Sequence, residues 1–224
     1  MSVQKHMLAS GTPYATPYYV ISGVSPGPVF MIISGIHGNE PASTRAAQAL
    51  AGSFLRGEMT LRRGKLIIVP LVNVIARRKG IRGRPDLNRT FPAGAGSKAS
   101  HPLSAALYQL ALRYRPSWYL DLHEANGLSQ LNPRRVGQTL LISRGSSATG
   151  TARRIIRRMN RSITNKAYRF NLRQRERAGT SRLAVQHLGA RAVTVETCWS
   201  LDFPLRVRLQ KEVVCHFLWV AGVL

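Results

Sequence analysis

The stretch VFMIISGIHGNE, residues 29–40, decides the fold of this chain. Its apolar part, Val29–Ile36, is rich in β-branched and aromatic residues, which predicts a strand buried in the centre of a sheet. The segment Pro41–Leu55 follows with a helical pattern and a proline in its first turn. Because a strand passes into a helix here, His37 and Glu40 are expected at the carboxyl end of a buried strand.

The same arrangement occurs twice more along the chain. The predicted strand Trp118–Leu122 runs into His123, and the predicted strand Ala192–Val195 runs into Glu196. Strand and helix patterns alternate throughout, which predicts an α/β fold: a single domain over residues 1–224, with a central mixed, largely parallel, twisted sheet flanked by helices. Ligands bind at the carboxyl ends of strands in such sheets, so these polar residues are expected to converge at one edge.

The residue types at that edge suit a divalent metal. His37 and Glu40 are spaced three residues apart, so an imidazole and a carboxylate can reach one point as the chain turns. A catalytic zinc ion takes three protein ligands and keeps a position for water, and His123 would supply the third ligand. A His-x-x-Glu pair alone also occurs by chance, but the three residues together predict one zinc ion per chain. Another divalent metal is an open alternative.

Glu196 ends the apolar run AVTVE, residues 192–196, and has two interpretations. An unpaired carboxylate in a buried strand is costly, so it requires a reason. The residue either forms a salt bridge with one of the many arginines, or it is a general base that takes a proton from water.

The loop motif DLNRTFP, residues 86–92, contains groups that recognise a carboxylate. Arg89 presents a planar guanidinium fork, and Asn88 adds an amide donor. Asp86 is placed to accept the free N–H of a metal-binding histidine and so to fix its tautomer. The alternative interpretation is an arginine-rich surface loop.

The composition limits the classes of partner. The 33 Lys and Arg residues against 9 Asp and Glu residues give a net charge of +24, which favours anionic partners such as nucleic acid, anionic lipid or acidic polymers. No familiar nucleic-acid-binding motif is present, which disfavours nucleic acid as the partner. The longest apolar stretch, Val213–Leu224, is shorter than the ~20 residues that span a bilayer, and no signal sequence is visible. We therefore expect a cytoplasmic protein without a membrane partner.

Four motifs together make a specific signature. In chain order they are GIHGNEP (residues 35–41), DLNRTFP (86–92), DLHEA (121–125) and TVET (194–197). With these motifs the chain resembles the zinc carboxypeptidase (M14-like) superfamily, and within it the succinylglutamate desuccinylase/aspartoacylase branch. The resemblance implies a zinc-dependent hydrolase that cleaves an amide bond next to a carboxylate.

The resemblance also implies a role for each matching residue. His37, Glu40 and His123 would hold the zinc ion, and Glu196 would be the general base. The remaining roles fall in and before the second motif: Asn88 and Arg89 would hold the substrate carboxylate, Asp86 would support a ligating histidine, and an upstream arginine would polarise the scissile carbonyl. We expect this arginine to be Arg82, with Arg78 and Arg84 as alternatives. Only one predicted helix follows Glu196, so the small C-terminal β domain of aspartoacylase-like enzymes is not expected here.

Three functions follow from these expectations. The first is a deacylase of N-acyl amino acids, and the second is a metallocarboxypeptidase that releases C-terminal residues from acidic or cell-wall peptides. In both, the substrate is a small molecule or peptide with a carboxylate, and the basic surface favours an acidic one. The third, from another class, is a basic nucleic-acid-binding protein on a hydrolase scaffold, suggested by the arginine-rich helix predicted at Thr151–Thr164.

Overall fold

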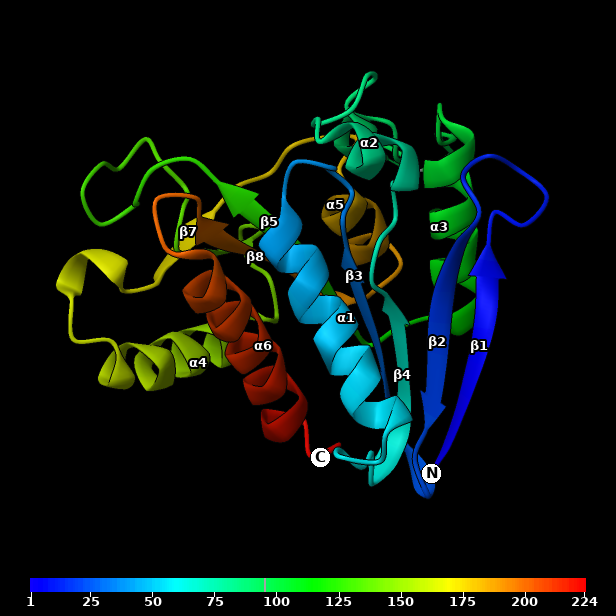
Figure 1. Cartoon of the computed structure of the whole chain (residues 1–224), viewed down its shortest axis with the longest axis horizontal. Helices are drawn as coiled ribbons and strands as arrows, with labels where there is room; N and C mark the ends of the chain where they lie inside the picture. Colours follow the sequence, from blue (N-terminus) through cyan, green and yellow to red (C-terminus); the bar gives the residue numbers. More distant parts are fainter. Residues whose placement is uncertain (95) are drawn as a thin grey trace.

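A single mixed sheet organises the computed structural model, which describes residues 1–94 and 96–224 (Figure 1). Its eight strands lie in the order β1-β2-β4-β3-β5-β8-β6-β7. The strands are β1 (Ser2–Leu8), β2 (Thr16–Ser22), β3 (Ser25–Ser34), β4 (Arg63–Val69), β5 (Trp118–Ala125), β6 (Thr139–Ile142), β7 (Asn171–Gln174) and β8 (Arg191–Cys198). The central strands β4, β3, β5 and β8 are mutually parallel, which confirms the predicted fold class.

Helices cover both faces of the sheet. They are α1 (Pro41–Leu55), α2 (Val74–Lys79), α3 (Pro102–Tyr114), α4 (Thr149–Ser162), α5 (Ser181–Gln186) and α6 (Phe203–Val220), with short 3₁₀ turns at Leu87–Arg89 and Lys166–Tyr168. Apolar residues of α1, α4 and α6 form one core with Ile32 of β3, and residues of α3 and α5 form the other core with Ile33. Because successive strand residues face opposite sides, the buried run of β3 contributes to both cores.

Two strands extend further than the sequence predicted. Their polar residues were expected just past the strand ends, but β5 continues to Ala125 and β8 to Cys198. His123 and Glu196 therefore lie within the sheet, directly opposite each other in the β5–β8 ladder. The ladder persists because β8 is also paired on its other side, where Thr139 of β6 is the partner of Glu196.

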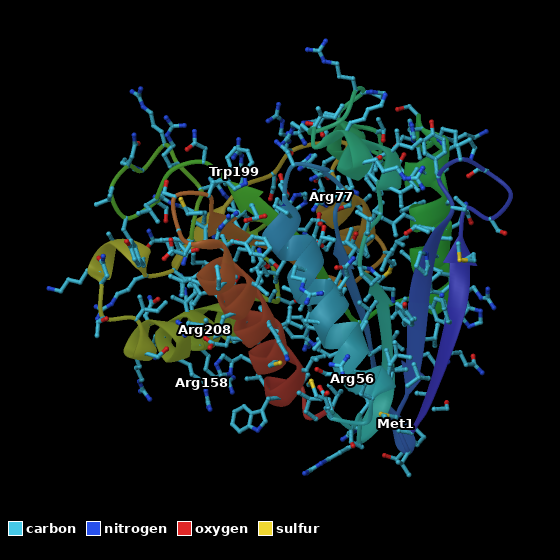
Figure 2. All side chains as sticks on the ribbon, in the orientation of Figure 1. Met1, Arg56, Arg77, Arg158, Trp199 and Arg208 are labelled. Carbon is cyan, nitrogen blue, oxygen red and sulfur yellow. The ribbon has the colours of Figure 1, made fainter. Side chains whose placement is uncertain are left out.

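Basic side chains project from many separate elements. Figure 2 labels Arg56 after α1, Arg77 on α2, Arg158 on α4 and Arg208 on α6, and all four are exposed. The positive charge of the chain is therefore spread over its surface. Among the described residues, no helix combines the length and the apolar character that a membrane crossing requires.

Candidate metal centre and active site

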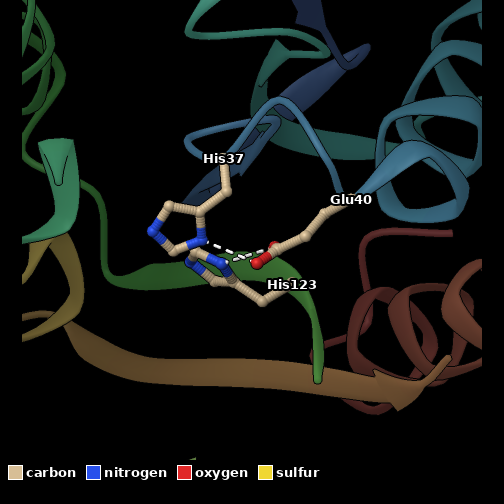
Figure 3. Close-up of side chains that lie close together, drawn as sticks. All are labelled: His37, Glu40 and His123. Atoms are coloured by element: carbon tan, nitrogen blue, oxygen red, sulfur yellow. Dashed lines mark hydrogen bonds and ion pairs between the residues drawn. The ribbon is translucent and has the colours of Figure 1, made fainter. Parts of the chain in front are cut away.

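Three buried side chains meet at the carboxyl edge of the central strands. His37 and Glu40 come from the turn between β3 and α1, and His123 comes from β5 (Figure 3). Glu40 Oε1 lies 2.7 Å from His37 Nδ1, and Glu40 Oε2 lies 2.9 Å from His123 Nδ1. The possible donor atoms of the three residues all lie within 4.8 Å of one another. The fold thus brings together the three residues for which the sequence predicted a shared metal.

Two glycines shape the turn that carries His37 and Glu40. Gly35 has φ of 68°, a conformation that residues with a Cβ atom rarely adopt. At Gly38, a Cβ atom would lie 2.0 Å from the carbonyl carbon of Ala76, so α2 packs directly against the turn. The close approach of α2 explains why this position carries no side chain.

Each histidine lies between two carboxylates. On the side away from Glu40, His37 Nε2 is 3.0 Å from Asp86 Oδ1, and His123 Nε2 is 2.9 Å from Asp121 Oδ1. Because carboxylates only accept hydrogen bonds, each imidazole can satisfy both neighbours only by carrying an extra positive charge. A divalent cation bound to the two Nδ1 atoms, which face Glu40, would supply that charge. The Nε2 nitrogen of each histidine would then keep its hydrogen and stay paired with Asp86 or Asp121. The arrangement fits a metal ion.

The electrostatics of the cluster favour the ionised form of Glu40. Burial raises the pKa of Glu40, but His123 and His37 outweigh burial and lower it to about 2. Burial lowers the pKa of His123, yet Asp121 and Glu40 raise it well above its ordinary value. The same pairing that raises the pKa of His123 would attract a cation. Two imidazoles and one carboxylate are a donor set that suits zinc.

Glu196 faces a cavity of ≈ 300 Å³ that also borders the three-residue cluster. Burial raises the pKa of its carboxyl group to about 8; His123 and Arg82 lower this pKa, while Glu40 and Asp121 raise it. None of the ion pairs formed within residues 1–94 and 96–224 includes Glu196. Of the two interpretations from the sequence, the structure gives no salt bridge and leaves the carboxyl group open to the cavity.

Arginines dominate the rest of the cavity wall. Those that line it are Arg82, Arg89, Arg175, Arg177 and Arg182. Arg82 Nη2 lies 3.0 Å from Asp86 Oδ2, and its Nη1 lies 3.8 Å from Glu40 Oε1, which places this guanidinium beside the cluster. Arg78 and Arg84 are exposed and do not line this cavity. Of these three arginines, Arg82 is the one that lies beside the candidate metal ligands.

Asn88 and Arg89 lie on the same wall. Asn88 Oδ1 accepts the Ser181 N–H at 2.9 Å, and Asn88 Nδ2 lies 3.3 Å from His123 Nε2. Burial lowers the pKa of Arg89, and neighbouring guanidiniums, those of Arg177 and Arg175 among them, lower it too, against the opposing effect of Asp86. A bound anion would relieve this crowding of positive charge.

The structure adds supporting residues that the sequence did not reveal. Ser181 Oγ donates to Asp121 Oδ2, and Gln210 Nε2 donates to the carbonyl oxygen of His123 at 2.6 Å. These contacts tie α5 and α6 to the strand that carries His123. The sequence indicates the supporting role of Gln210 only through its polar side chain, which interrupts the apolar pattern of the closing helix.

Glu124 has a structural role, because its carboxylate contacts the helices next to the site. Its Oε2 accepts the Ala42 N–H in the first turn of α1 at 2.7 Å, and its Oε1 pairs with Arg206 of α6. The side chain of Glu124 is fully buried and that of Arg206 is 13% exposed. The pair therefore fixes the start of α1, just after Glu40, against β5 and α6.

Removing one member of this pair is expected to destabilise the protein. Arg206→Met should lower the free energy of unfolding by about 3 kcal/mol, because it leaves Glu124 buried without its counter-charge. Urea denaturation measures the change. The matched control is Arg208→Met, which removes an exposed arginine 3.7 Å from Glu212 and should change stability by less than about 0.5 kcal/mol. Equal effects of the two substitutions would contradict the structural role of the pair.

Comparisons with known proteins identify the family and the fold. A family model described as the succinylglutamate desuccinylase/aspartoacylase catalytic domain matches residues 26–203. Tripeptide-bound cell shape determinant Csd4 from Helicobacter pylori superposes with a TM-score of 0.78 at 19% identity, over 92% of this chain and 55% of that one. No curated protein sequence matches the chain.

Two further solved structures share the fold. The product-bound ectoine utilization protein EutE (DoeB) from Ruegeria pomeroyi has a TM-score of 0.68 at 23% identity, over 94% of this chain and 62% of that one. A succinylglutamate desuccinylase/aspartoacylase from Rhodobacter sphaeroides has a TM-score of 0.69 at 18% identity, over 99% and 66%. The chain thus spans between about half and two thirds of the length of these structures.

Proposed function

Because the chain belongs to the succinylglutamate desuccinylase/aspartoacylase catalytic-domain family, we propose that it is a zinc-dependent hydrolase that cleaves an amide bond next to a carboxylate. Membership confirms the resemblance carried by the four motifs and supports the hydrolase class. The observation that carries the proposal is the placement of a candidate metal-binding cluster, an unpaired, half-buried carboxyl group and several arginines around one cavity.

His37, Glu40 and His123 would hold the zinc ion. When bound, zinc supplies Lewis acidity that makes water a nucleophile near neutral pH and polarises a carbonyl group. Asp86 orients the His37 imidazole by accepting its outer N–H, and Asp121 pairs with the outer nitrogen of His123 at 2.9 Å, so the Nδ1 atoms face inward.

Glu196 would move the proton in the reaction. Its carboxylate takes a proton from the attacking water and gives it to the amine that leaves, so one group acts first as base and then as acid. Glu196 lies opposite His123 in the sheet and borders the same cavity as the cluster, and both observations support this role. A positive ion in the cluster would lower the pKa of Glu196 from about 8 and favour the basic form.

The arginines and Asn88 would position the substrate. Arg82, next to Glu40, stabilises negative charge on the carbonyl oxygen of the scissile amide. Arg89 and Asn88 bind the substrate carboxylate, which fixes the bond that lies over the cluster. The additional arginines of the wall favour a substrate that carries further negative charge.

Among hydrolases of this kind, we propose a deacylase of N-acyl amino acids. The cavity volume of ≈ 300 Å³ lies at the lower end of the range for ligand pockets, which favours a small substrate over a long peptide. The second candidate is a metallocarboxypeptidase. Its support is the fold shared with Csd4, described as a D,L-carboxypeptidase, whose structure binds a tripeptide.

Release of primary amine from a substrate panel tests the proposal. The panel contains N-acetyl and N-succinyl amino acids, short peptides, and the same compounds with the carboxylate converted to an amide. A deacylase acts on the acylated amino acids, whereas a carboxypeptidase acts on the peptides. Release from the amidated compounds at the same rate as from the free acids would overturn the proposed carboxylate recognition.

Arg89→Met gives a sharper version of this test. The substitution should lower kcat/KM for the free acids by about 10- to 100-fold, because a charge-assisted pair with the carboxylate is lost. It should leave the slow reaction of the amidated compounds nearly unchanged, so the preference for the free acid disappears. A variant that keeps the wild-type preference would show that Arg89 does not bind this group.

A further inference from the structure

Helix α4 presents a continuous basic face to solvent. Five of its residues are exposed arginines: Arg153, Arg154, Arg157, Arg158 and Arg161. Its other face, with Ala152, Ile155 and Met159, is buried in the core. The spacing of the arginines repeats with the helical turn, so the guanidinium groups form a row along one side of the helix.

The row has no acidic counterpart. The sequence of α4 contains neither Asp nor Glu, and the ion pairs within residues 1–94 and 96–224 include none of its arginines. On the neighbouring helix α6, the carboxylate of Glu212 is 3.7 Å from Arg208. Clustered like charges repel one another, and a polyanion that neutralises several of them would bind favourably.

A groove with an aromatic side chain runs beside this row. It has a volume of ≈ 780 Å³ and lies between α4 and the C-terminal end of α6, and it shares no lining residue with the cavity at Glu196. Trp219 is 59% exposed on its wall, and the guanidinium of Arg158 lies 4.9 Å from the centre of the indole ring. Arg158 and Arg208 project from α4 and α6 in the same region of Figure 2.

We propose that this groove binds single-stranded nucleic acid, with phosphates held by Arg154, Arg157 and Arg161 and a base stacked on Trp219. A positively charged groove next to an exposed aromatic ring is the combination that binds single strands without sequence preference. Guanidinium groups suit phosphate because their planar fork binds it with two parallel hydrogen bonds. The proposal is independent of the hydrolase activity.

Other anionic partners fit the surface less well. An amphipathic helix that binds a membrane inserts its apolar face, but the apolar face of α4 is already buried in the core. Duplex DNA is usually read by a helix that enters the major groove, whereas α4 lies flat against the sheet and α6. The sequence disfavoured nucleic acid because it contains no known motif, and it could not reveal the groove or the position of Trp219.

Binding of the full-length protein to a fluorescently labelled oligothymidylate tests the proposal by anisotropy over a salt series. The triple variant R154Q/R157Q/R161Q should lose most of the affinity, and the slope of log affinity against log salt should become shallower by about 2. Trp219→Ala should weaken binding roughly tenfold through lost stacking, and Trp219→Phe should recover part of the loss.

The matched control is R45Q/R77Q/R134Q, which removes the same charge from three exposed positions outside the groove. Retained binding by this control supports the proposal, and an equal loss in both triple variants overturns it, because the charge of the whole surface would then be responsible. Unchanged affinity of Trp219→Ala also overturns it, even if the first triple variant fails to fold. Binding to phosphatidylglycerol vesicles without binding to the oligonucleotide would identify a membrane surface instead.

Discussion

Glu196→Gln should lower kcat for amide hydrolysis by about 10²- to 10⁴-fold while zinc binding stays intact. The amide has nearly the same shape as the carboxyl group, but it cannot take a proton from water or return one to the leaving amine. Glu196 is not a member of the metal-binding cluster, so the variant should hold one zinc ion like the wild type. Steady-state amine release and metal analysis of the same sample measure both effects.

The control for this substitution is Glu58→Gln. Glu58 is exposed and pairs with Arg56 at the surface, so its loss should leave kcat unchanged. If Glu196→Gln retained more than about a tenth of the wild-type kcat, another group would have to be the general base. The unpaired carboxyl group of Glu196 on the cavity wall would then need a different explanation.

His123→Ala should weaken zinc binding by more than about 100-fold. Substitution of an outer residue that only orients a metal ligand typically weakens metal affinity by about 10- to 100-fold. His123→Ala removes a ligand itself, so its effect should be larger. It also leaves Glu40 and Asp121 buried without the imidazole between them. Equilibrium dialysis with metal analysis measures the loss, and hydrolysis should fall with it.

His101→Ala is the matched control, because His101 lies outside the cluster. Its Nδ1 accepts the Leu103 N–H at the start of α3, so the variant should lose about 1 kcal/mol of stability and keep its zinc. Excess zinc should raise the melting temperature of the wild type and of this control, since ligand binding stabilises the folded state. The same rise in His123→Ala would contradict the proposed ligand set.

The sequence predicted the central elements of the fold well. Helix α1 has the predicted bounds because its apolar period and its initial proline agree. The edge strands β1 and β7 were missed: β1 is largely exposed and lacks a clear alternation of apolar residues, and β7 has only four residues. Helix α2 was not predicted, because it has only six residues, three of them basic, and depends on the Asn73 side-chain cap and on Gly80 at its end.

The candidate ligands could be predicted because parallel strands place their carboxyl ends at one edge of a sheet. Their supporting contacts could not. Ser181, Arg206 and Gln210 reach the site only because α5 and α6 pack against β5 and β8, and no local pattern encodes that packing. The groove at Trp219 depends in the same way on how α4 and α6 lie together.

The most direct test of the central claim is zinc-dependent amine release. Wild-type protein is stripped with a chelator and titrated with zinc against the N-acyl amino acid panel, with Glu196→Gln in parallel. Our account predicts activity that rises up to one equivalent of zinc and is lost in the variant, although the variant binds the metal. Release that does not depend on zinc, or that is equal in the two proteins, would contradict it.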